Sequence, residues 1–245
     1  MIDLHCHILP TLDDGAVDLE DSVAMARMAE SDGIEIICAT PHIHPNHQVA
    51  VPELEDRVET VNRELESRAI PVRVRRGGEI AEPIVDSLGD DVLEALTLGG
   101  NGRWLLIEPR PGPIDSHLLD AVDRLDVRGF ECIVAHPERH AGERFREHLE
   151  ELTRRGALIQ VTAELIAHGP ASPTMLDMAA EGLVHVLGSD AHSSHGGRAV
   201  KLSHGLERLH EVDRVRPHID WVAEHGPRAV IAGERTAPPF APVWP

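Results

Sequence analysis

The chain has 245 residues, and its 42 Asp and Glu against 23 Lys and Arg give a formal net charge of −19 at pH 7. This acidity and an aromatic content of 2% disfavour a nucleic-acid binder, because such proteins use clustered basic residues and stacking aromatic rings. No apolar run approaches the roughly 18 residues of a membrane span, and the first residues carry no export signal, so we expect a cytoplasmic protein without a membrane segment.

Seven apolar, β-branched segments predict strands, and they alternate along the chain with segments of helical periodicity. The predicted strands are residues 1–7, 34–42, 72–80, 104–108, 132–136, 158–162 and 184–190. The predicted helices are residues 19–31, 53–68, 114–125, 143–155 and 173–181. Asp18 can cap the first helix, and the glycines that follow four helices are Gly33, Gly129, Gly156 and Gly182.

This alternation predicts an α/β fold with right-handed crossovers and a mostly parallel sheet. At about 35 residues per unit, the predicted units fill the chain without a second domain. We therefore expect one domain over residues 1–235 and a proline-rich, non-helical tail over residues 236–245. A closed or nearly closed barrel is favoured over an open dinucleotide-binding sheet, because no GxGxxG motif follows the first strand.

Histidine and carboxylate side chains concentrate where the predicted strands end. His5 and His7 alternate with Cys6, so both histidines lie on one face of the first strand. In a parallel barrel the carboxyl ends of all strands meet at one rim, where barrel active sites lie. The residues expected to converge there are His5, His7, His42, Glu79, Glu108, His136, Asp190 and His192.

This combination of side chains predicts a metal site. A lone histidine at a strand end is usually a hydrogen-bonding partner, but six of the seven predicted strands end in imidazole or carboxylate groups. Imidazole and carboxylate without cysteine suit Zn²⁺, Mn²⁺ or Fe. The set exceeds what one tetrahedral ion needs, so we expect two or three ions bridged by a carboxylate.

Six short motifs are specific enough to suggest a family. They are His5-x-His7, Asp13-Asp14-Gly15, the ATPH that ends at His42, Gly78-Glu79, the AHPER of residues 135–139 and the GSDAH of residues 188–192. In this order they resemble the PHP family (polymerase and histidinol phosphatase), and most of all the bacterial tyrosine-protein phosphatases of capsule and exopolysaccharide loci. The resemblance runs from residue 1 to about residue 235. It implies a distorted seven-stranded (β/α) barrel with a trinuclear metal site.

The resemblance also implies which residues hold each ion. The first would be held by His5, His7, Glu79 and Asp190; Glu79 would bridge to a second, held also by His42 and His136; Asp14 and His192 would complete a third, which contacts the substrate phosphate. Arg139 and Arg198 match positions that clamp the phosphate. Manganese is the implied metal, with iron or zinc as alternatives.

The implied activity is phosphotyrosine hydrolysis, on the phosphorylated tail of a tyrosine kinase of polysaccharide export. We expect a hydroxide bridging the metals to attack phosphorus without a covalent phosphoenzyme. Arg139 and Arg198 would bind the equatorial oxygens, and Asp14, His192 or a metal-bound water would protonate the leaving phenolate. The rival design needs a cysteine and, six positions later, an arginine. Cys6, Cys38 and Cys132 are followed there by Leu12, His44 and Glu138, so we expect three core thiols.

Several alternatives remain open. A histidinol-phosphate phosphatase or other small-molecule phosphoesterase would share the metals and differ in the pocket wall, and a non-catalytic, metal-stabilised scaffold is a third class. An amidohydrolase is disfavoured because Lys201, the only lysine, follows the last predicted strand. Glu108 is expected to be a hydrogen-bonding partner of the ligands. His44 and His47 either line the pocket beside His42 or lie on a solvated loop.

Overall fold

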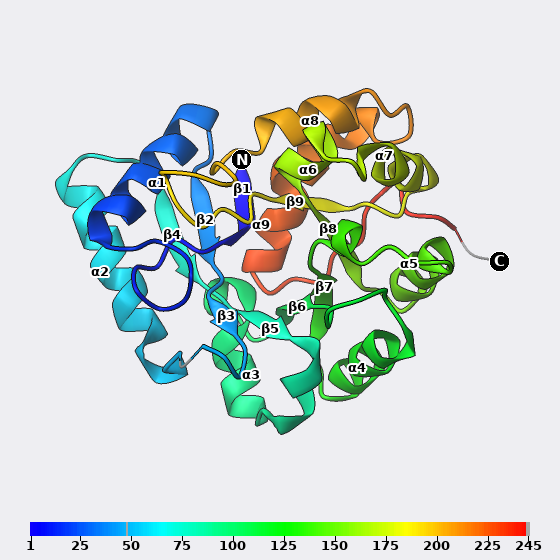
Figure 1. Ribbon diagram of the computed structural model, residues 1–245, viewed down its shortest axis with the longest axis horizontal. Coiled ribbons are helices and arrows are strands. Elements are labelled where there is room, and N and C mark those ends of the chain that lie inside the picture. Colours follow the sequence, from blue (N-terminus) through cyan, green and yellow to red (C-terminus); the bar gives the residue numbers. More distant parts are fainter. Residues whose placement is uncertain (48, 244–245) are drawn as a thin grey trace.

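Parallel strands form the centre of the protein and helices surround them (Figure 1). The computed structural model describes residues 1–47 and 49–243. Its strands are β1 (Ile2–Cys6), β2 (Ile36–Ala39), β3 (His42–Ile43), β4 (Arg73–Arg76), β5 (Glu79–Ala81), β6 (Trp104–Glu108), β7 (Glu131–Val134), β8 (Leu158–Thr162) and β9 (Val186–Gly188). The fold is therefore α/β, as the alternation predicted.

The strands form two parallel sheets that curl toward closure. Their orders are β1-β2-β4 and β3-β5-β6-β7-β8-β9. A parallel bridge between Cys6 and Ala191 brings the chain after β9 back beside β1. The predicted count of seven strands is not confirmed, because two predicted strands are each divided in two. Pro41, which has no amide hydrogen to donate, separates β2 from β3, and two glycines separate β4 from β5.

The long helices follow the sequence pattern closely. The helices are α1 (Leu19–Asp32), α2 (Leu54–Ser67), α3 (Asp90–Leu96), α4 (Ser116–Val127), α5 (Phe145–Arg154), α6 (Ala163–His168), α7 (Ser172–Glu181), α8 (Ser203–His210) and α9 (Gly226–Ile231). The Asp18 side chain accepts a hydrogen bond from the Asp21 amide and caps α1 as predicted. All four glycines predicted at helix ends have φ between 82° and 90°, which disfavours any other residue.

The core is apolar and holds all three cysteines. Cys6, Cys38 and Cys132 are buried and free, which confirms them as core thiols. Burial raises the pKa of the Cys38 thiol to about 12, so it stays protonated and unreactive at neutral pH.

The first part of the proline-rich tail packs on the domain. Residues 236–243 contain no helix, while residues 244–245 lie outside the described part of the chain. Phe240 is buried, with its ring against those of Trp221 and His218 at centroid distances of 5.9 and 5.8 Å. This aromatic contact holds the tail against the fold.

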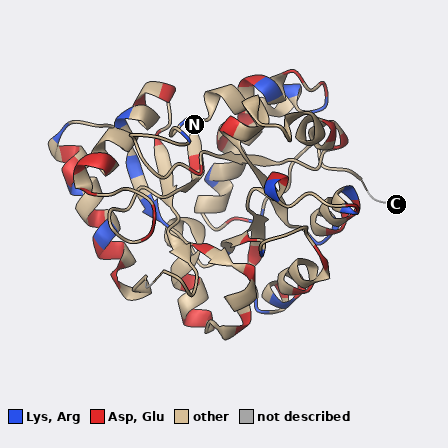
Figure 2. Cartoon of the chain, in the orientation of Figure 1, with Lys and Arg blue, Asp and Glu red and all other residues tan. Residues whose placement is uncertain are grey.

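Acidic side chains predominate on the surface (Figure 2), as the net charge of −19 leads one to expect. Figure 2 shows Asp and Glu spread over the outer helices, with Arg interspersed among them. Many of these charges form exposed pairs, such as Arg57 with Glu53 and Arg124 with Asp86. Within the described part of the chain, no helix is long and apolar enough to cross a membrane.

A buried neutral histidine makes stability depend on pH. His185 accepts a hydrogen bond from the Ile159 amide at Nδ1 and donates one to the Gly182 carbonyl from Nε2, both at 2.9 Å. Burial lowers the pKa of His185 from 6.5 to about 4. Protonation therefore favours the unfolded chain, and the stability that this group contributes is lost as the pH falls from 6.5 toward 4.

Between pH 7 and about pH 4, the wild-type free energy of unfolding should fall by about 3 kcal/mol more than that of a His185→Gln variant. Urea unfolding of both proteins at several pH values measures this difference. Parallel pH curves for the two proteins would contradict the assignment of a neutral His185.

Candidate metal centre

The predicted ligands lie at the carboxyl ends of the strands, as strand topology requires. His5 lies in β1 and His7 follows that strand directly, while His42 pairs in register with Glu79 between β3 and β5. His136 follows β7 and Asp190 follows β9, with left-handed φ values of 31° and 50°. Such conformations cost about 1 to 3 kcal/mol in residues other than glycine and concentrate at functional sites.

The Glu79 carboxylate lies at the centre of four imidazoles. Its Oε1 is 2.8 Å from His136 Nε2 and 3.3 Å from His5 Nε2. Its Oε2 is 3.0 Å from His42 Nδ1 and 3.3 Å from His7 Nε2. Burial opposes ionisation, but the charge of His5 and the hydrogen bond from His136 hold the pKa of Glu79 well below its usual range. Each oxygen thus faces two imidazoles, which is how a bridging ligand is arranged.

Ligand atoms that lie within 4.8 Å of one another define four groups in this region. They are His7, Asp14, His42 and His192; His5, His7 and Asp190; His5, Glu79 and His136; and His42, Glu79 and Glu108. The structure therefore brings together all eight predicted ligands and adds Glu108. His42 and His136 both contact Glu79 but share no group.

Burial and neighbouring charges shift the pKa values of several side chains in the centre. Burial opposes ionisation of Asp190, but His5 and His136 lower its pKa to about 2. Burial and the negative charge of Glu79 raise the pKa of Glu108 to about 7. Burial, with a contribution from the charge of His7, lowers the pKa of His192 to about 4. A bound cation would offset the charge of the crowded carboxylates and accept the lone pairs of the neutral imidazoles.

Two residues orient His5 and His7, and the sequence predicted neither role. Asp13 Oδ2 lies 2.8 Å from His7 Nδ1 and accepts a hydrogen bond from the His42 amide at 2.9 Å. Gln160 Oε1 lies 3.0 Å from His5 Nδ1. In each case the other ring nitrogen is left facing the centre, which is the usual support for a histidine that ligates a metal. Asp13 belongs to the Asp13-Asp14-Gly15 motif, but the resemblance implies a role for Asp14 alone.

Replacing Asp13 by Asn should weaken Mn²⁺ binding by about 10- to 100-fold, because Asn removes the charge that fixes the orientation and basicity of His7. Burial opposes its ionisation, yet the hydrogen bond and charge of His7 lower the pKa of Asp13 to about 2, so it is ionised at neutral pH. Equilibrium dialysis with Mn²⁺ measures the change. Asp18→Asn, which alters only the cap of α1, is the control, and equal affinity in Asp13→Asn and wild type would contradict the role.

Both predicted arginines line a cavity that opens beside the centre. The cavity has a volume of about 380 Å³ and is lined by Asp14, His42, Glu108, Arg139, Asp190, His192, Gly197 and Arg198. The Arg139 guanidinium contacts the Asp190 carboxylate, and Arg198 Nη2 lies 3.2 Å from both Asp190 Oδ2 and His192 Nδ1. Both guanidinium groups therefore lie where an anion next to the metal ligands would bind.

His44 and His47 do not line this cavity among the described residues. The His47 ring stacks on His42 with centroids 5.3 Å apart, and the His44 ring meets His47 edge-on. His44 and His47 therefore pack beside His42 and outside the cavity.

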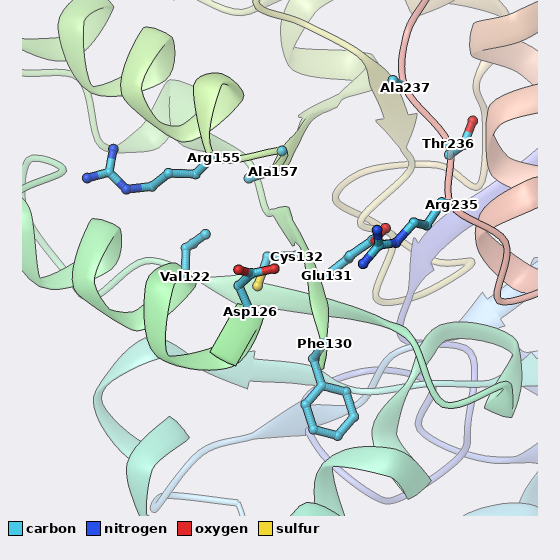
Figure 3. Close-up of a pocket in the computed structure, with 11 residues that line it drawn as sticks. Val122, Asp126, Phe130, Glu131, Cys132, Arg155, Ala157, Arg235, Thr236 and Ala237 are labelled. Atoms are coloured by element: carbon cyan, nitrogen blue, oxygen red, sulfur yellow. The ribbon is translucent and has the colours of Figure 1, made fainter. Parts of the chain in front are cut away.

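Another hollow, of about 400 Å³, lies at the opposite end of the strands (Figure 3). It is lined by residues at the start of β7 and before β8, including Phe130, Cys132 and Ala157. Figure 3 shows Arg235 reaching toward Glu131, 3.0 Å away, while Arg155 points to the other side, where it pairs with Asp123. These pairs already neutralise both arginines, and none of the predicted ligands lines this hollow.

Comparison with known proteins agrees with this geometry. The tyrosine-protein phosphatase YwqE of Bacillus subtilis is 34% identical over 204 residues, which cover 79% of this chain and 78% of YwqE. A chain from the crystal structures of Bacillus subtilis YwqE and Streptococcus pneumoniae CpsB, which are metal-dependent tyrosine phosphatases, superposes over the full length of both chains with a TM-score of 0.82 and 28% identity.

A more distant structure shows the fold alone. The histidinol phosphate phosphatase of Lactococcus lactis has a TM-score of 0.62 and 12% identity, over 86% of this chain and 93% of that one. The relatives of higher identity confirm the resemblance to bacterial tyrosine-protein phosphatases. Finally, the family model for capsular polysaccharide synthesis proteins, CpsB/CapC, matches residues 1–214. The chain belongs to the CpsB/CapC family.

Proposed function

We propose that this protein is a metal-dependent protein-tyrosine phosphatase. The observation that carries the proposal is the Glu79 carboxylate among four imidazoles, next to a cavity that two arginines line. The donors fit metal ions, because the buried Glu79 Oε2 lies near the nitrogens of His42 and His7 yet accepts no hydrogen bond from any described residue. The relationship to tyrosine-protein phosphatases supports the phosphotyrosine substrate.

We infer three ions, held by groups that differ in part from those that the resemblance implied. The first would be held by His5, His7, Glu79 and Asp190; the second by Glu79, Glu108 and His136; the third by Asp14, His42 and His192. His42 groups with Glu79 and Glu108 as well as with Asp14 and His192; we assign it to the third ion because Asp14 and His192 alone would leave that ion with two ligands. Glu108 becomes a ligand because its carboxylate lies 3.8 Å from His42 Nδ1 and 4.0 Å from His136 Nε2.

The mixture of carboxylate and imidazole donors suits Mn²⁺, with Fe or Zn²⁺ as the alternatives. When bound, such ions supply hydroxide near neutral pH and offset the charge of the phosphate. Side chains of the protein would bind and orient the phosphate beside these ions. Arg139 and Arg198 would donate hydrogen bonds to the equatorial phosphate oxygens, and the fixed guanidinium geometry orients the phosphate.

The leaving phenolate of tyrosine needs little help from an acid, because tyrosine has a pKa of about 10. Asp14 and His192 lie at the exposed edge of the cavity, where they would act as ligands of the third ion and carry no proton to donate, so the phenolate would leave without a proton from the protein. We infer that the curled sheet is a distorted seven-stranded barrel, in which each divided strand counts once, and that residues 1–235 form one catalytic domain.

Replacing Arg139 by Lys should lower kcat/KM for a phosphotyrosine peptide by about a hundredfold, because Lys keeps the charge but loses the paired donors. Steady-state kinetics measure the loss, and the bound metal per chain should remain at the wild-type value. Arg146→Lys is the control, since Arg146 lies on the exposed surface of α5 and pairs with Glu150 and Glu181. Wild-type kinetics in Arg139→Lys would exclude a phosphate clamp at this position.

A substrate panel tests the function itself. Purified protein with Mn²⁺ should hydrolyse a phosphotyrosine peptide faster than a phosphoserine peptide, histidinol phosphate or a dinucleotide. A peptide from the phosphotyrosine tail of a polysaccharide-export tyrosine kinase is the proposed natural substrate, and the capsular family supports that choice. Exclusive turnover of histidinol phosphate would overturn the proposal in favour of a small-molecule phosphatase, and no turnover of any substrate would favour a scaffold.

A further inference from the structure

A second cluster of potential ligands lies outside the centre, between helices α6 and α8. Glu164 and His168 are one turn apart on α6, and His204 is the second residue of α8. We propose that these three side chains form a further divalent-metal site, suited to Zn²⁺, that cross-links the two helices. The proposal does not depend on the phosphatase activity.

The geometry of the three side chains fits a small cation. One ligand atom from each lies within 4.8 Å of the other two. His204 Nδ1 is 3.7 Å from Glu164 Oε2, and the rings of His168 and His204 are 5.4 Å apart at 71°. A tetrahedral zinc ion holds its nitrogen and oxygen ligands about 3.4 Å apart, so small side-chain rotations bring the atoms into range.

An orphaned nitrogen points to a missing partner. His204 Nδ1 is buried and has no hydrogen-bond partner in the described part of the chain, although Glu164 lies nearby. A simple ion pair between Glu164 and His204 leaves that nitrogen unsatisfied and gives His168 no role. Two imidazoles and one carboxylate are the protein ligands of several zinc sites, in which water fills the fourth position. Glu164 and His204 are about one-third exposed, so water can reach the ion.

The sequence holds the two helices close enough for this site. A Cβ at Gly205 would lie 2.9 Å from Ala163 Cα, so only glycine allows α8 to approach α6 this closely. Figure 1 shows the two helices side by side. Asp32 accepts hydrogen bonds from the amides of Leu202 and Ser203 and fixes the start of α8. His204 is therefore held in place before any ion binds.

The proposed site differs in metal preference from the main centre. With two imidazoles among three ligands it favours Zn²⁺ over Mn²⁺, whereas the main centre is richer in carboxylate. A bound ion would also anchor the segment that joins β9 to α8. This segment carries His192 and Arg198, so the cross-link would limit the motion of the cavity wall.

Zinc content tests the proposal directly. Metal-free protein is dialysed against buffered free Zn²⁺, and bound zinc per chain is measured by elemental analysis. His204→Gln and Glu164→Gln should each bind one zinc fewer than wild type. His210→Gln is the matched control, because His210 is an exposed histidine on the same helix, and it should bind the wild-type amount.

A second measurement separates this site from the main centre. Both variants should keep the wild-type Mn²⁺ content, and Zn²⁺ should raise their Tm by less than it raises that of wild type. Equal zinc content in wild type, His204→Gln and Glu164→Gln overturns the proposal. So does an equal loss of zinc in His210→Gln, since the loss would then not be specific to the cluster.

Discussion

Treatment with a chelator is expected to abolish phosphotyrosine hydrolysis by this protein, and added Mn²⁺ to restore it, while thiol alkylation leaves the rate unchanged. The physical reason is that Glu79, Asp190 and the histidines around them form a donor set for cations rather than for a covalent intermediate. Without cations, these groups hold one another's charges and offer no activated nucleophile. The rate of phosphotyrosine hydrolysis should therefore fall to the uncatalysed background rate.

The cysteines make the contrast with a covalent phosphatase sharp. Cys6, Cys38 and Cys132 are each at most 2% exposed, so iodoacetamide should not modify them in the folded protein. Single-turnover hydrolysis in H₂¹⁸O should place the label in phosphate, and no phosphocysteine should be trapped. Full activity after exhaustive chelation, with the metal content verified as zero, would refute metal dependence.

The sequence predicted which side chains lie together at the strand ends, because strand topology converts spacing into position. Alternation placed His5 and His7 on one face, and parallel strands brought Glu79, His136 and Asp190 to the same rim. These steps need only the strand ends, which the short apolar segments mark. The division of the strands at Pro41 was not predicted, since strand propensity continues across the break on both sides.

Roles that depend on side-chain direction were missed. Asp13 lies in a loop whose path no periodicity predicts, so its contact with His7 could not be inferred. Gln160 lies in a buried strand, where its neighbours are set by register with β9 rather than by local sequence. Helices α6 and α8 have six and eight residues, too few for an apolar period, so the Glu164–His168–His204 cluster was also hidden.

Glu79→Gln should lower kcat/KM for phosphotyrosine by at least about a thousandfold and release at least one metal ion per chain. Gln has the size and shape of Glu but binds cations weakly, and the change removes the one carboxylate that faces all four imidazoles. The fold should survive, because the amide can still accept a hydrogen bond from His136. Circular dichroism checks the fold, and elemental analysis counts the metal.

Glu82→Gln provides a matched control, since Glu82 is another buried carboxylate only three residues away. Its two oxygens accept hydrogen bonds from Arg110 at 2.6 and 2.7 Å and belong to none of the ligand groups. Both substitutions remove a buried negative charge, so any general effect of that loss appears in both variants. Only Glu79→Gln should lose metal. Wild-type metal content in Glu79→Gln, or an equal loss of metal in Glu82→Gln, would contradict the bridging role of Glu79. Replacing a bridging carboxylate must release an ion, whereas replacing a carboxylate that only pairs with an arginine releases none.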